Sequence, residues 1–216
     1  MNWIRKKLKR NPDKFLQNIS GVIHVGANTG QEREIYDKLS LRVLWIEPIP
    51  EVFETLKANL RGFPDQRAIQ HLVTDRDDEE YQFHIANNLL SSSILDLKHH
   101  KDVWPDVNYT NTLLLRSITL TSLFEKEHID PSNYQALIMD TQGSELLVLK
   151  GSIPVLQNFK YVKTEVWDVE IYAGCCQLAD INLFMTQYGY KEFSRHKIAK
   201  RPKGGSCFDV VYKRKT

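Results

Sequence analysis

The chain has 216 residues, of which 42% are hydrophobic and 26% are charged, and its formal net charge is +2. A chain of this size can bury a core of its own, so we expect one globular domain over residues 21–216 after an N-terminal helical extension over residues 1–20. No apolar run approaches the roughly 20 residues that a membrane-spanning helix needs, and no membrane span is expected.

The three cysteines, Cys175, Cys176 and Cys207, are too few for a disulfide framework, and their spacing fits no common zinc site. We therefore expect reduced thiols, a cytoplasmic location and no metal. The basic segment over residues 1–10 is not followed by an apolar core, which argues against a secretory signal.

Positive charge gathers at the two ends of the chain. Five of the first ten residues are Lys or Arg, and residues 191–216 carry nine basic residues against two acids. The simpler interpretation is two solvated ends, and the alternative is a basic face for a membrane surface or an anionic substrate.

In chain order, the hydrophobic pattern predicts alternating strands and helices. The expected strands cover residues 21–26, 41–46, 67–73, 81–86, 112–120, 134–139 and 161–166. The expected helices cover residues 2–19 (broken near Pro12), 31–39, 48–60, a short stretch from Thr121, 144–150 and 176–188. Residues 87–111 read as a long active-site loop, and residues 190–194 and 208–213 as a closing hairpin. This order predicts an α/β protein with a Rossmann-like, doubly wound, mostly parallel sheet and a C-terminal antiparallel hairpin.

The first two predicted strands form a candidate nucleoside site. Gly26 and Gly30 follow the first strand and allow a sharp turn and a close approach of the backbone to a ligand. Glu47 ends the second strand, where an ionised carboxylate can accept hydrogen bonds from both ribose hydroxyls. The alternative is a tight turn beside an exposed glutamate.

The turn itself discriminates between nucleosides. An NAD-binding turn reads G-x-G-x-x-G, whereas residues 26–31 read G-A-N-T-G-Q, so Asn28 replaces the middle glycine that lets the backbone approach a pyrophosphate. A dinucleotide is therefore disfavoured. S-adenosylmethionine has no phosphate, and Asn28 and the backbone around Ala27 could bind its amino and carboxylate groups.

Four motifs follow one another along the chain, at residues 25–31 (V-G-A-N-T-G-Q), 45–48 (W-I-E-P), 91–93 (S-S-S) and 138–151 (I-M-D-T-Q-G-S-E-L-L-V-L-K-G), with Glu165 further on. In this order they resemble the motifs of the FkbM family of S-adenosylmethionine-dependent methyltransferases. The resemblance implies a class I methyltransferase fold, S-adenosylmethionine as cofactor, and O-methylation of a hydroxyl on a sugar, glycan or other small metabolite. The family often has an acid where this chain has His24, and that acid helps to bind the methionine amine through water.

Methyl transfer to a hydroxyl benefits from in-line alignment and from a general base. The candidate bases are acids near the carboxyl ends of the predicted fourth and fifth main strands: Asp140, Glu145, Glu165 and Asp168. We favour Glu165 or Glu145 and expect Asp140 to face the cofactor. Glu145 has a structural alternative, because an acid in the first turn of a helix can cap it.

Further candidates have simpler alternatives beside them. Asp75 could meet the adenine amino group, or it could belong to a charged turn. Ser92, Ser93 and Trp167 could contact the acceptor, or they could be turn and core residues. The histidines of the long loop, His99 and His100, could be bases, but loop histidines are usually surface groups.

Three other functions remain open. Nucleic-acid amino or cytosine methyltransferases would often carry Asn/Asp-Pro-Pro-aromatic or Pro-Cys at the end of the fourth strand, where residues 140–143 read D-T-Q-G. Nucleic acid is therefore disfavoured as a partner, although the basic ends keep RNA in consideration. An NAD enzyme is disfavoured by the turn, and a non-catalytic cofactor-binding module would bind without turnover.

Overall fold

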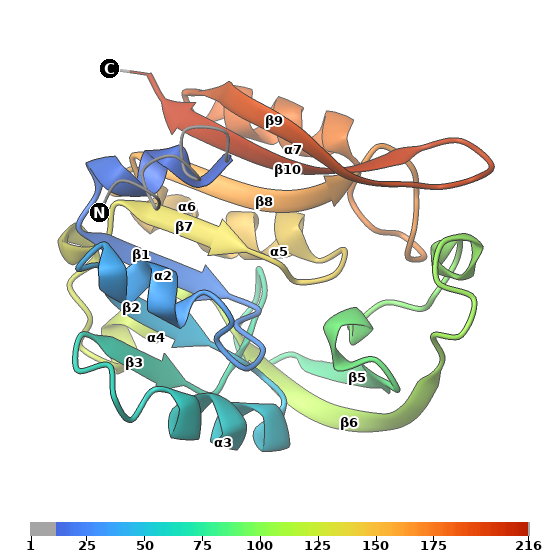
Figure 1. Ribbon diagram of the computed structural model, residues 1–216, viewed down its shortest axis with the longest axis horizontal. Coiled ribbons are helices and arrows are strands. Elements are labelled where there is room, and N and C mark those ends of the chain that lie inside the picture. The colour runs from blue at the N-terminus through green and yellow to red at the C-terminus, as the bar shows by residue number, and fades with distance from the viewer. Residues whose placement is uncertain (1–11, 216) are drawn as a thin grey trace.

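A central seven-stranded sheet organises the computed structural model, which describes residues 12–215 (Figure 1). Its strands in spatial order are β3 (Gln66–Ile69), β2 (Arg42–Ile46), β1 (Gly21–Val25), β7 (Ala136–Met139), β8 (Tyr161–Trp167), β10 (Ser206–Arg214) and β9 (Tyr190–Lys200). The first five run parallel, and β10 pairs antiparallel with both β8 and β9. This confirms the predicted doubly wound sheet with its closing hairpin.

Helices cover both faces of this sheet (Figure 1). One face packs against α4 (Leu120–Lys126), α5 (Glu145–Gly151), α6 (Ile153–Leu156) and α7 (Leu178–Gln187). The other packs against the 3₁₀ helix η1 (Pro12–Asn18), α2 (Arg33–Lys38) and α3 (Pro50–Asn59). Successive residues of a strand point to opposite faces, so along β1 Ile23 and Val25 enter the first core while Val22 enters the second.

A small second sheet departs from the prediction of a single strand over residues 67–73. The chain leaves the central sheet after β3, and β4 (Leu72–Val73) pairs with β6 (Tyr109–Ile118), which in turn pairs with β5 (Glu80–Ala86). The apolar pattern runs through the break, which is why the sequence did not predict it. In Figure 1 this sheet reaches away from the lower end of the central sheet.

The long loop predicted over residues 87–111 is shorter, because β6 begins at Tyr109, and it holds two short 3₁₀ helices, η2 (Leu89–Ser91) and η3 (His100–Asp102). A third, η4 (Pro131–Asn133), precedes β7. The amides of Lys98, His99 and His100 all donate to the carbonyl of Ile171, which ties the loop to the segment after β8. The loop is therefore anchored along its second half.

The closing hairpin is longer than predicted. The sequence assigned residues 197–206 to a Lys/Gly-rich connection, but β9 continues to Lys200 and β10 begins at Ser206. Most side chains of β9 are exposed, so its outer half shows no alternation of apolar and polar residues. Near its turn, Arg201 and Lys203 form ion pairs with Asp102 of η3.

The N-terminal extension is described only from Pro12 onward, and the part of the predicted helix before it lies outside the described residues. Pro12 begins η1, as suits a residue with a fixed φ and no N–H. Phe15 packs against Tyr161, with ring centroids 5.2 Å apart. No helix among the described residues is long and apolar enough to cross a membrane.

A glycine substitution tests the packing between the two sheets. A Cβ at Gly151, at the end of α5, would overlap the carbonyl oxygen of Thr74, whereas a Cβ at Gly62 would meet nothing within 4 Å. We predict that Gly151→Ala lowers the free energy of unfolding by about 2 kcal/mol or more, the scale of overpacking. Urea unfolding measures this, with Gly62→Ala as the control. Equal stability of the two variants would contradict the packing described.

Candidate active site

A cavity of about 220 Å³ lies at the carboxyl edge of β1, β2 and β7. This is where the strand order of the sheet reverses, and open α/β sheets bind ligands at that position. Seven of the residues predicted for the site line it: His24, Gly26, Ala27, Asn28, Glu47, Ser92 and Asp140. We refer to it as the cofactor cavity.

The glycine turn after β1 is fixed by the neighbouring strands. The amides of Gly26 and Ala27 donate to the carbonyl of Ile46 at 3.0 and 3.1 Å. Gly26 has φ +80°, and a Cβ there would overlap the carbonyl oxygen of Asp140. Gly30 does not line the cofactor cavity, and it packs against Leu56 of α3 instead. Gly26 thus allows two strand ends to meet, while Gly30 serves the turn.

Glu47 joins the end of β2 to this turn. It is 4% exposed, and its two carboxylate oxygens accept hydrogen bonds from the amides of Asn28 at 2.8 Å and Ile49 at 2.9 Å. Burial raises the pKa of Glu47 to about 7, the backbone hydrogen bonds oppose that rise, and the charge of Asp140 adds to it. Each oxygen keeps a lone pair, and the carboxylate can therefore still accept from a sugar hydroxyl.

His24 lies behind the turn as a neutral imidazole. Its ring stacks on Trp45 with centroids 4.9 Å apart, and its Nδ1 lies 3.2 Å from the hydroxyl of Tyr36. Burial, with a smaller contribution from the charge of Lys163, lowers the pKa of His24 to about 3. The family that the sequence resembles often has an acid at this position. In this chain the position therefore carries no charge.

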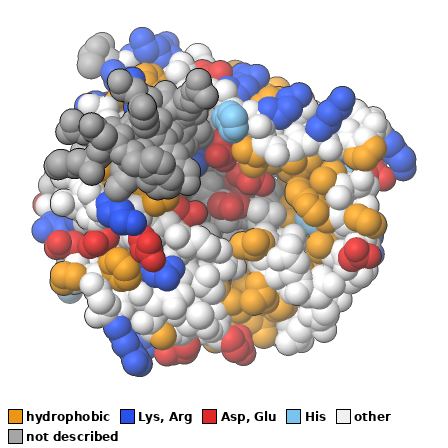
Figure 2. Space-filling view, viewed as in Figure 1, with side chains coloured by type: hydrophobic (Ala, Val, Ile, Leu, Met, Phe, Trp, Pro, Cys, Tyr) orange, Lys and Arg blue, Asp and Glu red, His pale blue; other side chains and the backbone are white. Residues whose placement is uncertain are grey.

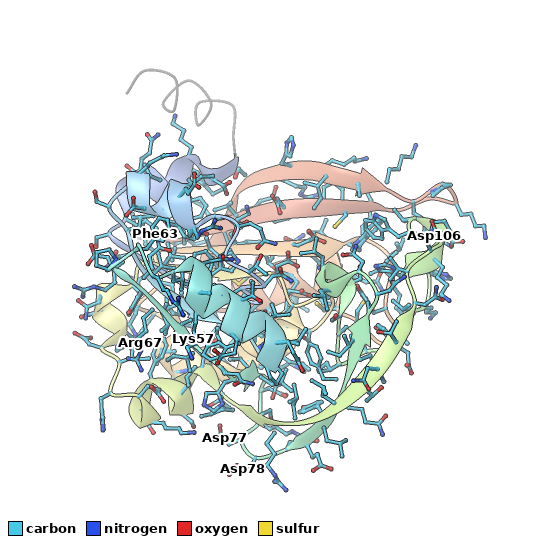
Figure 3. All side chains as sticks on the ribbon, turned by 60° about the horizontal axis from the view of Figure 1, so that its bottom comes forward. Lys57, Phe63, Arg67, Asp77, Asp78 and Asp106 are labelled. Carbon is cyan, nitrogen blue, oxygen red and sulfur yellow. The ribbon has the colours of Figure 1, made fainter. Side chains whose placement is uncertain are left out.

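The opposite wall of the cofactor cavity is largely apolar, and its residues were not predicted from the sequence. It includes Ile49, Leu72, Val73, Phe83, Leu89 and Leu90, beside His71. Asp75 does not line this cavity, and its backbone packs near Gly151. Asp77 and Asp78 of the same turn lie at the edge of the molecule (Figure 3). The strand breaks between β3 and β4, and residues 71–73 line the cavity after the break.

A second cavity, of about 250 Å³, adjoins the first and shares His24, Glu32 and Asp140 with it. We refer to it as the acidic cavity, because Asp13, Glu165 and Asp209 also line it. Acidic side chains gather in a hollow on the face shown in Figure 2. Glu32, Lys163 and Asp209 were not predicted, since they lie on three separate elements and belong to no local motif.

Two of the predicted catalytic acids, Asp140 and Glu165, face the acidic cavity. Burial raises the pKa of Glu165 to about 8, and the charges of Asp140, Asp209 and Glu145 add to the effect. Burial also raises the pKa of Asp140, against a hydrogen bond of 2.6 Å that its Oδ1 accepts from the side-chain amide of Gln142.

Glu145 has a different place. It is 2% exposed, lines neither cavity, and accepts hydrogen bonds from the amides of Thr141 at 2.9 Å and Gly143 at 3.1 Å. Burial raises the pKa of Glu145, while these hydrogen bonds favour its charged form. Glu145 therefore holds the loop after β7, and its role as a catalytic base stays a prediction.

Of the three residues predicted to contact the methyl acceptor, one lines the cofactor cavity and two line neither the cofactor cavity nor the acidic cavity. Ser92 lines the cofactor cavity, and its hydroxyl oxygen accepts from the amide of Ala86 at 3.1 Å. Ser93 is 1% exposed, and its hydroxyl donates to the carbonyl of Gln142 at 2.8 Å. Trp167 is 5% exposed and packs edge-on against Trp104, so it lines neither cavity.

Gln142 connects these groups, although no sequence motif assigned it a role. Its φ of +52° is unusual for a residue with a side chain. Its side-chain oxygen accepts from the hydroxyl of Tyr172 at 2.7 Å, while its nitrogen donates to Asp140. Within residues 12–215, no three His, Cys, Asp or Glu side chains come together as metal ligands.

A family model described as the methyltransferase FkbM domain matches residues 24–192. The chain belongs to the FkbM methyltransferase family. Its cofactor is S-adenosylmethionine. The glycine turn, the buried acid at the end of β2 and the apolar wall of the cofactor cavity fit a nucleoside that carries no phosphate.

A curated relative of this FkbM protein is the 2-O-methyltransferase NoeI of Sinorhizobium fredii strain NGR234, which is 22% identical over 162 residues. The match covers 71% of this chain and 65% of the relative's length. Two solved structures share the fold. Mycoplasma capricolum TrmK with S-adenosylhomocysteine has a TM-score of 0.54 at 7% identity, over 97% of this chain and 68% of the other. Streptococcus pneumoniae Sp1610 with S-adenosylmethionine has a TM-score of 0.50 at 8% identity, over 97% and 72%.

The hydrogen bonds of Glu47 generate a prediction for cofactor binding. In Glu47→Gln the shape is kept, but one acceptor oxygen becomes an NH₂ group that faces a backbone N–H or a ribose hydroxyl. We predict that affinity for S-adenosylhomocysteine falls by about tenfold or more, the scale of losing a charge-assisted hydrogen bond. Calorimetry measures this, with the exposed Glu54→Gln of α3 as the control. An unchanged affinity would remove Glu47 from the cofactor site.

Proposed function

We propose that this FkbM protein transfers the methyl group of S-adenosylmethionine to a hydroxyl of a sugar, a glycan or another small metabolite. The observation that carries the proposal is the junction of the two cavities. They meet at Asp140, and Glu165, a carboxyl with a raised pKa, lines the acidic cavity but not the cofactor cavity. A hydroxyl in the acidic cavity would lie between the cofactor and a candidate base.

Each part of the site has a role in this scheme. The turn over residues 26–30 binds the methionine end of the cofactor, Glu47 binds the ribose, and the wall formed by Leu72, Phe83 and Leu89 encloses the adenine. The cofactor supplies an electrophilic methyl group on a sulfonium. The carboxylate of Glu165 accepts the hydroxyl proton, because a hydroxyl is a weak nucleophile until its proton leaves.

The choice of oxygen as the methyl acceptor has two supports. The segment after β7 carries Asp140 to Gly143 where amino or cytosine methyltransferases of nucleic acids would often carry proline motifs. NoeI, the relative described above, is named as a 2-O-methyltransferase. The acidic cavity also disfavours a nucleic acid, whose phosphates would be repelled by its carboxylates.

An acceptor screen tests the proposed reaction. The full chain is incubated with S-adenosylmethionine and a panel of sugars, glycans and hydroxylated metabolites, and the products are examined by mass spectrometry for the gain of one methyl group. We expect gain on a hydroxyl oxygen of at least one small acceptor. Tight cofactor binding with no transfer would favour a non-catalytic binding module, and transfer only to RNA would favour the nucleic-acid alternative.

Glu165 should control the pH dependence of the reaction. A base must be ionised to accept a proton, so kcat/KM, which reports the free enzyme, should rise with pH and level off above about 8. Glu165→Gln should lower kcat by about 10²-fold or more and remove this dependence. Glu192→Gln, on the edge strand β9, is the control. A variant of Glu165 that retains the full rate and the same pH profile would show that another group is the base.

A further inference from the structure

The acidic cavity holds more negative charge than the described residues neutralise. Its five carboxylates come from different parts of the chain: Asp13, Glu32, Asp140, Glu165 and Asp209. The one ammonium group that the described residues place there, that of Lys163, pairs with Asp13 at 2.8 Å and with Asp209 at 3.3 Å. Among residues 12–215, no cation forms an ion pair with the other three acids.

Burial makes these three charges costly. Taking a carboxylate out of water without a partner is unfavourable, and a native structure either pairs such a group or keeps it protonated. Burial accordingly raises the pKa of Glu32, Asp140 and Glu165. A cation that enters the cavity would stabilise the charged form of all three.

His24 offers a second polar group to a ligand at the junction of the two cavities. It is 6% exposed and lines both cavities. Its Nδ1 is paired with the hydroxyl of Tyr36. Its Nε2 has no hydrogen-bond partner among the described residues, and it is not among the polar atoms that are fully buried from solvent without a partner. A buried ring nitrogen that opens onto a cavity can form a hydrogen bond with a ligand there.

The cofactor accounts for only part of this charge. Its methionine end carries an ammonium and a sulfonium against one carboxylate and so brings a single net positive charge, and the cofactor cavity reaches Glu32 and Asp140 but not Glu165. One net positive charge cannot compensate both shared acids and also Glu165. Among the described residues, at least one carboxylate therefore has no cation and can pair with one carried by the other substrate.

We propose that the methyl acceptor is a hydroxylated amine, such as an amino sugar with a free amino group, and that its ammonium lies among Glu32, Asp140 and Glu165. This inference rests on the proposed function and specifies its substrate class. The ammonium has no lone pair, so the neighbouring hydroxyl is the nucleophile. Its oxygen forms the new bond to the methyl carbon, the carbon–sulfur bond breaks, the electron pair returns to sulfur, and the hydroxyl proton passes to Glu165.

The proposal has a mechanistic consequence for the base. An ammonium beside Glu165 would lower the pKa of its carboxyl group and keep it ionised near neutral pH, where the empty site favours the protonated form. A cationic acceptor would thus, on binding, keep the Glu165 carboxylate ionised and able to accept a proton.

Binding of isosteric sugars tests the proposal without knowledge of the natural acceptor. The full chain, saturated with S-adenosylhomocysteine, is titrated calorimetrically with glucose and with aminodeoxyglucoses that carry the amino group at carbon 2, 3 or 6. We expect at least one amino sugar to bind about tenfold or more tightly than glucose at low ionic strength, and this preference to shrink at high salt. No preference for any amino sugar would overturn the proposal.

A pair of variants at the start of α2 tests where the ammonium group binds. Glu32 precedes this helix and forms no side-chain cap, so Glu32→Gln leaves the fold intact, and Glu34→Gln removes a largely exposed acid two residues away. The ratio of amino-sugar to glucose affinity should fall severalfold in Glu32→Gln and stay unchanged in Glu34→Gln. Equal ratios in the two variants would overturn the placement of the ammonium. Methyl transfer to neutral hydroxyls with no amine preference would overturn this inference alone, whereas no transfer to any hydroxyl would overturn the proposed function.

Discussion

The close approach of two strand ends is the constraint on which the site depends. Because Gly26 has no side chain, the carbonyl of Asp140 can lie against the turn that follows β1. That contact brings the cofactor turn next to the loop after β7, and Glu47 then fixes the same turn from β2 through the amide of Asn28. A larger residue at position 26 would separate the two cavities that must meet for methyl transfer.

The charge distribution of the site depends on His24, which stands in β1 where an acid was expected. His24 is neutral, stacked on Trp45 and bonded to Tyr36, so negative charge lies around it and not on it. The surrounding acids come from η1, the start of α2, and the strands β7, β8 and β10. This distribution moves the charge from the turn toward the acidic cavity, where an acceptor and not only the cofactor can use it.

The parts that the sequence predicted are those encoded in local patterns. The parallel strands, the glycine turn and Glu47 follow from short apolar runs with glycines and an acid at the correct spacing. Glu32, Lys163 and Asp209 could not be placed together, because their proximity depends on the pairing of β10 with β8 and on the packing of α2. Asp75 does not line the cofactor cavity, and the break between β3 and β4 before it interrupts a continuous apolar run. The residue types of Glu145, predicted as catalytic, and Ser93, predicted as a substrate contact, also suit a residue that holds a loop, and their hydrogen bonds show the loop contacts.

The central claim is that the cofactor and acceptor sites meet at Asp140. A crystal structure of the full chain with S-adenosylhomocysteine tests it most directly. The account predicts ribose hydroxyls within hydrogen-bond distance of the Glu47 carboxylate and a sulfur atom that faces Asp140 and the acidic cavity. A nucleoside bound elsewhere, or a sulfur atom turned away from the acidic cavity, would contradict it.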